Sequence, residues 1–213
     1  MSALNAGPSK PTRPTRAQTM EMTRQRLLVA ARALIAEHGY TAATINAVAE
    51  RADVTHGGVH THFPEKLLLG IAVLTEWVGE VADHVDQYAQ IYSWNELGDP
   101  ANALARVLSD LRWVRLHMEL TAESRCEPVV HDSIALLRTK LAQAITATRG
   151  PRSSEPDTEP DEPEALAAMI LTYLYGSVSI GAWNPEASTD TLIATISLIL
   201  KQHSSSRLPQ SLG

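Results

Sequence analysis

Residues 44–63, which read TINAVAERADVTHGGVHTHF, decide the fold of this chain. Each half of the stretch begins with a threonine, a good helix N-cap, and continues with apolar residues at helical spacing. The pattern predicts two short helices, over 44–51 and 55–63, joined by a three-residue turn. Val54 and Val59 occupy the positions of a hydrophobic staple at the start of the second helix. Two helices joined in this way have the layout of a helix-turn-helix.

The second of these helices opens with an unusual pair of glycines, Gly57 and Gly58. Each glycine in a helix costs about 1 kcal/mol relative to alanine. A backbone that must come close to a phosphate would explain that cost, because bare amides at a helix start bind anions. The alternative is that one glycine only relieves crowding against the first of the two helices.

The sequence on either side predicts further helices and no strands, so the fold class is all-α. The other predicted helices cover residues 23–38, 67–88, 101–122, 129–148, 165–185 and 188–202. Residues 165–185 carry no charge, and a membrane span must be considered for them. Polar residues inside the segment and acidic residues before it favour a buried helix instead.

The predicted domains follow from these elements. They are an arm without fixed structure over 1–20, a helix-turn-helix domain over 21–66, a larger helical domain over 67–205, and a tail over 206–213. Residues 149–164, with four prolines and six carboxylates, predict a flexible acidic loop within the last domain.

Composition excludes several classes of protein. The chain has 213 residues, 44% of them hydrophobic, which is enough for a core and excludes a disordered or collagen-like protein. A single cysteine excludes an intrachain disulfide, and the first 20 residues lack the apolar core of a secretory signal. We therefore expect a cytoplasmic protein.

The net charge of −6, taken for the whole chain, argues against binding of nucleic acid. That argument fails when the distribution of charge along the chain is considered. Residues 1–70 hold eight basic and five acidic side chains, a balance of +3, and the remainder carries −9. A basic head on an acidic body is typical of a module that binds a polyanion.

The head also resembles a known family. The segments that carry the resemblance are Thr23-Arg24, Ala30-Ala31, Leu34 to Tyr40, Thr44 to Ala49, Ala52 to Lys66, and Leu68. They are similar to the DNA-binding domain of TetR-family transcriptional regulators. The resemblance implies an all-helical homodimer, a recognition helix in each major groove, and a small-molecule pocket in the C-terminal domain. It makes residues 21–66 the DNA-binding domain and residues 67–205 the helical effector-binding and dimerisation domain.

The resemblance also implies DNA contacts. The candidate contact residues are Arg24, Thr44, Thr55, His56, Gly57, His60, Thr61, His62 and Lys66. Two of them depart from the family pattern, because the family usually has lysine at the position of His56 and tyrosine at the position of His60. Protonated histidine binds phosphate better than neutral histidine, so we expect operator binding to tighten from pH 8 to pH 6. The two histidines are spaced i, i+4 and could instead hold a metal, but no third ligand is evident.

The C-terminal domain offers weaker signals. The candidate ligand-binding residues are Trp113, His117, Leu120, Tyr173, Ser177 and Trp183. Aromatic residues at helical spacing are more often plain core. We identify no catalytic set, metal site or cofactor motif.

The sequence thus predicts a dimeric, sequence-specific DNA-binding transcriptional regulator. It would act as a repressor that a small-molecule effector releases from a palindromic double-stranded operator. Its helices near 164–183 and 188–202 would pair as a four-helix bundle in the homodimer. The alternatives are a ligand-independent DNA-binding co-regulator and an all-helical enzyme.

Overall fold

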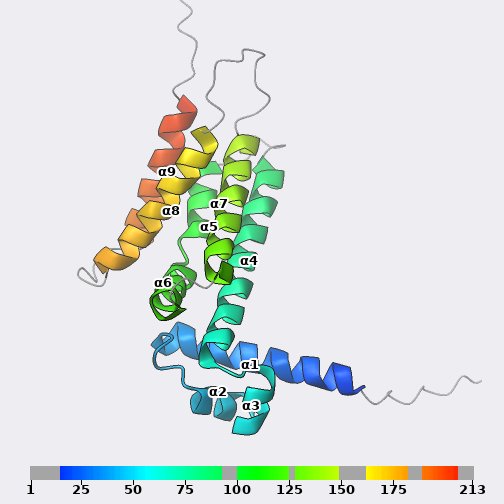
Figure 1. The fold of residues 1–213 in the computed structure, drawn as a ribbon. Helices are drawn as coiled ribbons and strands as arrows, with labels where there is room; N and C mark the ends of the chain where they lie inside the picture. Colours follow the sequence, from blue (N-terminus) through cyan, green and yellow to red (C-terminus); the bar gives the residue numbers. More distant parts are fainter. Residues whose placement is uncertain (1–14, 93–99, 125–127, 149–161, 182–188, 206–213) are drawn as a thin grey trace, which may run out of the picture.

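The computed structural model describes residues 15–92, 100–124, 128–148, 162–181 and 189–205 (Figure 1). Its described part is helical, and no strand occurs in it. The helices are α1 (Arg16–His38), α2 (Ile45–Ala52), α3 (His56–His62), α4 (Lys66–Tyr92), α5 (Pro100–Leu108), α6 (Arg112–Ser124), α7 (Pro128–Thr148), α8 (Glu162–Gly181) and α9 (Thr189–Ser205). The predicted all-α fold is confirmed.

Helices α1 to α3 form a head at one end of the molecule, and α4 rises from it into the body formed by the later helices (Figure 1). The head has its own apolar centre, to which each of its helices contributes. The buried members include Leu27, Ala31, Val48, Val59 and Phe63. A bidentate ion pair joins α1 to α2, with both Arg51–Glu37 nitrogen–oxygen distances at 2.8 Å.

Helix α1 begins earlier than the sequence analysis expects. Thr15 and Gln18 form a capping box, in which the Thr15 hydroxyl accepts from the Gln18 amide and the Gln18 side chain accepts from the Thr15 amide. The predicted arm over 1–20 is therefore wrong for residues 16–20, which are helical. Residues 1–14 lie outside the described part of the chain.

The turn between α2 and α3 is a Schellman motif. The Val54 amide donates to the Ala49 carbonyl at 3.0 Å, and the Asp53 amide donates to the Glu50 carbonyl at 3.2 Å. Asp53 takes the left-handed conformation that the motif requires, with φ at 53°. Aspartate tolerates this region better than most residues, and the two hydrogen bonds define the geometry of the turn. That geometry fixes the orientation of α3 relative to α2.

Gly70 allows the head and the body to pack closely against each other. A β-carbon on Gly70 of α4 would lie 2.6 Å from Tyr40 Cε2 and 2.9 Å from Leu120 Cδ2 of α6. Only a glycine therefore lets α4, α6 and the buried Tyr40 ring approach so closely. Burial, together with the nearby Glu119 and Glu123, raises the pKa of the Tyr40 hydroxyl.

In the body, α7 packs against α4 and α8, and α9 packs against α5. The predicted continuous helix over 101–122 is wrong, because the chain turns at 109–111 between α5 and α6. Ser109 Oγ donates to the Arg106 carbonyl at 2.8 Å, and Asp110 Oδ1 accepts from the Arg112 amide at 3.1 Å. Serine and aspartate end a helix in this way by offering its backbone other hydrogen bonds.

Two further predictions need adjustment. The predicted acidic loop over 149–164 ends earlier, since α8 already begins at Glu162, and residues 149–161 are not described. The uncharged stretch from residue 165 lies in α8, and no helix within the described ranges is long and apolar enough to cross a membrane.

Candidate functional site

The outer surface of the helix-turn-helix is formed mainly by α3 and by the two threonines that cap α2 and α3. Thr44 Oγ1 accepts from the Ala47 amide at 3.2 Å, and Thr55 Oγ1 accepts from the Gly58 amide at 3.1 Å. Both predicted N-caps are confirmed. Each hydroxyl uses a lone pair in its cap and keeps its hydrogen for an acceptor outside the protein, such as a phosphate oxygen.

The two glycines of α3 have different surroundings in the structure. A β-carbon on Gly58 would lie 2.6 Å from Val54 Cγ1 and 3.2 Å from Thr55 Oγ1, so packing within the turn requires glycine there. A β-carbon on Gly57 would meet nothing within 4 Å. Gly58 is therefore crowded, but by the turn residues Val54 and Thr55 and not by the first helix as predicted, and Gly57 has no such internal reason.

The histidines of α3 are largely outside the core. His56 and His60 are exposed, with ring centroids 4.6 Å apart, and His62 is half-buried. His60 Nδ1 lies 3.0 Å from the Pro64 carbonyl oxygen, which can only accept, so Nδ1 carries the proton. The neutral ring then has a bare Nε2, and protonation would add a donor there.

Thr61 follows the histidines on the same surface. Its hydroxyl donates to the Gly57 carbonyl at 2.9 Å, within the helix. The exposed oxygen therefore remains as an acceptor, which suits the amino group of a base better than a phosphate.

Two cations flank α3. Lys66 Nζ donates to the Thr41 carbonyl at 3.1 Å and lies 4.3 Å from the centroid of the Tyr40 ring. The Arg24 guanidinium lies 5.5 Å from the centroid of the Phe63 ring, so α1 places a positive charge beside the end of α3. Lys66 has further N–H donors, and both cations stay candidates for phosphate contacts.

The possible metal site at His56 and His60 finds no support. No group of three histidine, cysteine or acidic side chains that could hold a metal occurs in the described ranges.

The predicted ligand-binding residues do not form one group. His117 Nδ1 lies 2.8 Å from the Tyr175 hydroxyl, and Trp113 meets the same Tyr175 ring edge-on, with centroids 6.3 Å apart. Tyr175, which sequence reasoning missed, thus joins two predicted residues. Leu120 is fully buried beside Gly70 instead.

The remaining ligand candidates lie elsewhere. Ser177 Oγ donates to the Tyr173 carbonyl at 2.8 Å, within α8. Trp183 lies outside the described residues.

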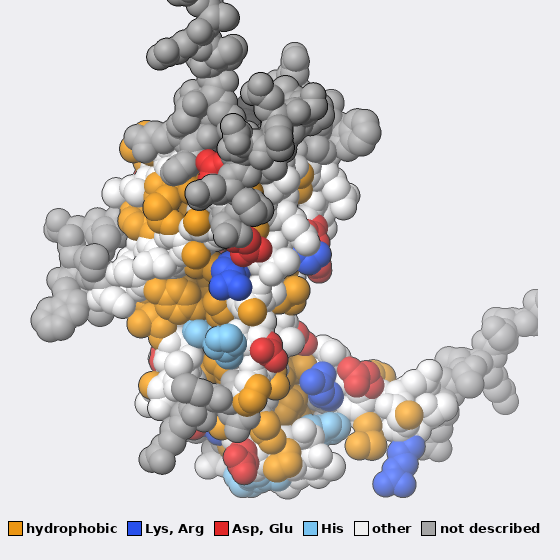
Figure 2. Space-filling view, turned by 45° about the horizontal axis from the view of Figure 1, so that its top comes forward, with side chains coloured by type: hydrophobic (Ala, Val, Ile, Leu, Met, Phe, Trp, Pro, Cys, Tyr) orange, Lys and Arg blue, Asp and Glu red, His pale blue; other side chains and the backbone are white. Residues whose placement is uncertain are grey.

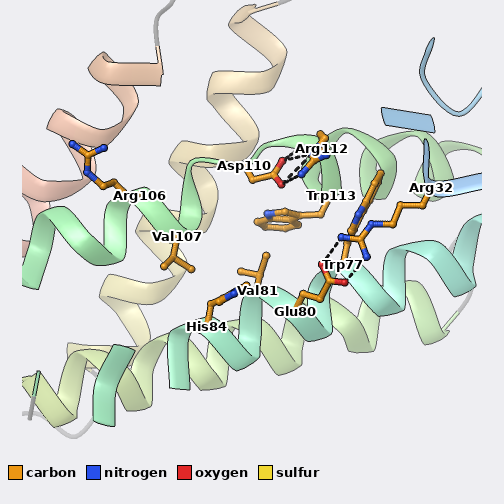
Figure 3. A pocket seen from close by; sticks show the side chains of 10 residues that line it. All are labelled: Arg32, Trp77, Glu80, Val81, His84, Arg106, Val107, Asp110, Arg112 and Trp113. Atoms are coloured by element: carbon orange, nitrogen blue, oxygen red, sulfur yellow. Dashed lines mark hydrogen bonds and ion pairs between the residues drawn. The ribbon is translucent and has the colours of Figure 1, made fainter. Parts of the chain in front are cut away.

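A cavity of about 440 Å³ lies where α1 and α4 meet the turn between α5 and α6 (Figure 3). We call it the junction cleft. Its charged and aromatic lining includes Arg32, Trp77, Glu80, Asp110, Arg112 and Trp113. Sequence reasoning identified only the last of these six.

Two ion pairs surround Trp77 in this cleft. Arg32 of α1 pairs through both terminal nitrogens with the Glu80 carboxylate of α4, and Arg112 Nε donates to Asp110 Oδ1 at 2.8 Å. The two guanidinium carbons lie 5.5 and 5.7 Å from the Trp77 ring centroid. Hydrogen bonds from these arginines hold the pKa values of Glu80 and Asp110 below their usual values.

The rigid turn, the exposed α3 and the flanking cations define a helix-turn-helix DNA-binding protein. Comparison with known proteins finds a family that matches this part of the chain. Residues 27–71 match the sequence profile described as bacterial regulatory proteins, tetR family. The head and the start of α4 are therefore similar to the DNA-binding domain of that family.

Further comparisons find relatives and solved structures that are similar to most of the chain. The HTH-type transcriptional repressor AcnR of Corynebacterium glutamicum is 25% identical over 178 residues, which cover 83% of this chain and 90% of AcnR. A putative TetR-family regulator from Mesorhizobium loti superposes with a TM-score of 0.65 at 17% identity, over 89% of this chain and 96% of that one. The multidrug binding protein EbrR, solved with imidazole, gives a TM-score of 0.57 at 21% identity, over 88% of this chain and 97% of EbrR.

Proposed function

We propose that the protein is a dimeric repressor that binds a palindromic DNA operator and leaves it when a small-molecule effector binds. The observation that carries the proposal is the exposed row on α3, where His56, Gly57, His60 and Thr61 face outward from a turn of fixed geometry. The name of the relative AcnR supports a repressor, and the name of the fold neighbour EbrR supports a ligand.

The predicted DNA contacts fall into two chemical groups, those that would bind phosphates and those that would contact bases. Thr44, Thr55, Arg24 and Lys66 offer donors or positive charge and would hold phosphates, which fixes the register without reading sequence. His56, Thr61 and His62 would bias the choice of base.

The homodimer would pair through the outer faces of α8 and α9. The exposed positions of α8 from Ala165 through Met169 and Thr172 to Ser179 follow at helical spacing and carry no charge. On α9, the exposed Ala194 and Leu198 lie between the exposed Asp190 and Lys201 at the two ends of the same face. Figure 2 shows hydrophobic side chains, with few charged ones among them, over the side of the body where these helices lie. Two such faces can pack as a four-helix bundle.

We further propose that the protein acts in the cytoplasm, where its operator would be, and that it performs no enzymatic reaction. The lone cysteine fits a reducing compartment. Control of transcription needs only binding and release.

Selection of full-length wild-type protein on random duplex DNA tests this function. We expect an enriched motif of two inverted half-sites, each read by one recognition helix. Failure to enrich any motif over the input would contradict the proposal.

The selected operator then allows a variant test by fluorescence anisotropy. Lys66→Ala should weaken binding to all sequences alike and reduce the slope of affinity against salt by about one counterion. Arg115→Ala, at an exposed arginine of α6, is the matched control and should leave both unchanged.

A further inference from the structure

Two tryptophans that line the junction cleft each have an indole donor without a partner among the described residues. Trp77 and Trp113 line the cleft and are 3% and 1% exposed. The indole nitrogen of each is buried without a hydrogen-bond partner among the described residues. An indole N–H can only donate, and a buried unpaired donor costs about 1–3 kcal/mol. A ligand whose acceptor atoms reach these indole groups from the cleft would remove that cost.

The charge of the lining points to the same kind of ligand. Three guanidinium groups, of Arg32, Arg106 and Arg112, and two carboxylates, of Glu80 and Asp110, line the cleft. Glu76 adds negative charge near Arg32 from outside the lining. Arg106 lies apart from the two ion pairs (Figure 3), and its Nε donates to Asn102 at 2.9 Å. The lining itself thus holds one more positive than negative charge.

The shape of the cleft limits the body of the ligand. The Trp113 ring lies across the middle of the cleft, near Val81 and with Trp77 on one side (Figure 3). Val107 adds a further apolar side chain. Flat aromatic rings and branched aliphatic side chains favour a planar apolar body. A volume of about 440 Å³ is at the small end of ligand pockets and suits one or two rings.

We propose that the junction cleft binds a planar organic carboxylate. The carboxylate would compete with Glu80 and Asp110 for the guanidinium groups of Arg32 and Arg112, and the rings would pack against Trp77 and Trp113. Bidentate pairing with a carboxylate is the geometry that arginine favours.

Binding in the cleft would act on the head directly. Arg32 belongs to α1, and its contacts with Glu80 and Trp77 connect the head to α4. A ligand that takes over this guanidinium changes that connection. The cleft is then the effector site, a conclusion that rests on the proposed function.

The binding arm uses the full-length protein without DNA, in isothermal titration calorimetry. The probes are benzoate, cinnamate and indole-3-acetate, each compared with its own primary amide, which has the same shape and no charge. We expect at least one carboxylate to bind with a Kd of about 1 mM or below, and at least tenfold tighter than its amide. Equal binding of carboxylate and amide, or no binding of any carboxylate in this range, overturns the proposal.

Variants locate the site. Arg112→Gln and, independently, Arg32→Gln should each weaken carboxylate binding at least tenfold, while Arg115→Gln, on the same helix as Arg112 but outside the cleft, should not. Thermal melting identifies any variant that fails to fold. If one cleft variant does not fold, the affinity of the other tests the proposal. Unchanged affinity in a folded cleft variant places the ligand elsewhere and overturns the proposal.

The operator arm separates this inference from the proposed function. Saturating carboxylate should weaken binding of the selected operator by about 5- to 150-fold. Operator binding that the carboxylate does not change overturns the effector role of the cleft and leaves the DNA-binding function standing. If no operator can be selected, the proposed function fails, whatever the calorimetry shows.

Discussion

Gly57 and Gly58 are neighbours in α3 that are constrained for different reasons. Gly58 faces Val54 at a distance that no β-carbon could occupy, whereas the space beside Gly57 is open. The first constraint belongs to folding, and any constraint on Gly57 must come from a partner. A matched pair of alanine substitutions can therefore separate the fold of the head from its contact with DNA.

Gly58→Ala should lower the free energy of unfolding by about 1–3 kcal/mol, as overpacking does. Gly57→Ala should raise it by up to about 1 kcal/mol through helix propensity and still weaken operator binding, because its methyl group would stand between the backbone and DNA. Thermal melting and fluorescence anisotropy measure the two effects. Unchanged operator affinity in Gly57→Ala would show that the backbone does not approach DNA there.

The exposed histidines of α3 predict a pH-dependent affinity. Protonation places a donor on His60 Nε2, because Nδ1 is already committed to the Pro64 carbonyl, and gives His56 a charge beside it. Operator binding at fixed salt should tighten from pH 8 to pH 6, and His56→Gln with His60→Gln should remove most of that change. His131→Gln, at an exposed histidine of α7, is the control. A flat wild-type profile would refute the prediction.

Among the elements, α6 connects the body to the head. Its His117 contacts Tyr175 of α8, and its Leu120 packs at Gly70 and Tyr40. On the same helix, Glu119 Oε1 would lie 3.8 Å from a β-carbon at Gly39. A shift of α6 in the body would therefore reach the head.

His117 should make stability depend on pH. Burial lowers its pKa, while a hydrogen bond to the Val130 backbone opposes the shift and His131 adds to it. The folded protein thus resists a proton that the unfolded chain takes up near pH 6.5, so the free energy of unfolding should fall from pH 7 to pH 5. Urea unfolding at each pH should show a smaller fall for His117→Gln. Exposed His38→Gln should not reduce it, and an equal fall in wild type and His117→Gln would contradict this role.

Sequence pattern predicted most elements because their causes are local. The N-caps Thr44 and Thr55 and the staple positions of Val54 and Val59 are visible in the chain itself. The early start of α1 is also visible in the sequence, as the Thr15–Gln18 capping box. The Pro-, Ser- and Thr-rich composition of residues 1–20 favoured an arm without fixed structure instead. The break at Ser109 and Asp110 was harder to see, because both residues also occur within helices.

The whole molecule brings together groups that sequence cannot place. The junction cleft joins Arg32 of α1, Trp77 and Glu80 of α4, and Arg112 of α6, and nothing in local periodicity indicates that they meet. The head was predictable because one contiguous stretch carries it. The cleft depends on tertiary packing, so only the structure reveals it.

The uncharged exposed face of α8, together with Ala194 and Leu198 in the middle of α9, predicts the dimer interface. Met169 and Leu198 are 42% and 55% exposed on it, and Met169→Glu with Leu198→Glu should convert the dimer to monomers, because it would bury four unpaired charges. Light scattering after size exclusion measures the mass. Leu136→Glu, at a leucine of α7 that is 50% exposed, should stay dimeric. A dimer that survives the double substitution would place the interface elsewhere.

The measurement that tests the central claim most directly is the affinity of the selected operator before and after insertion of about 5 bp, half a helical turn, between its half-sites. Two recognition helices held by one dimer reach successive major grooves on the same face of DNA. The insertion should therefore reduce affinity at least tenfold, and an insertion of about 10 bp should restore part of it only if the dimer can span the longer distance. Equal affinity for the intact operator and the half-turn insertion would contradict a dimer that reads a palindrome through two copies of α3.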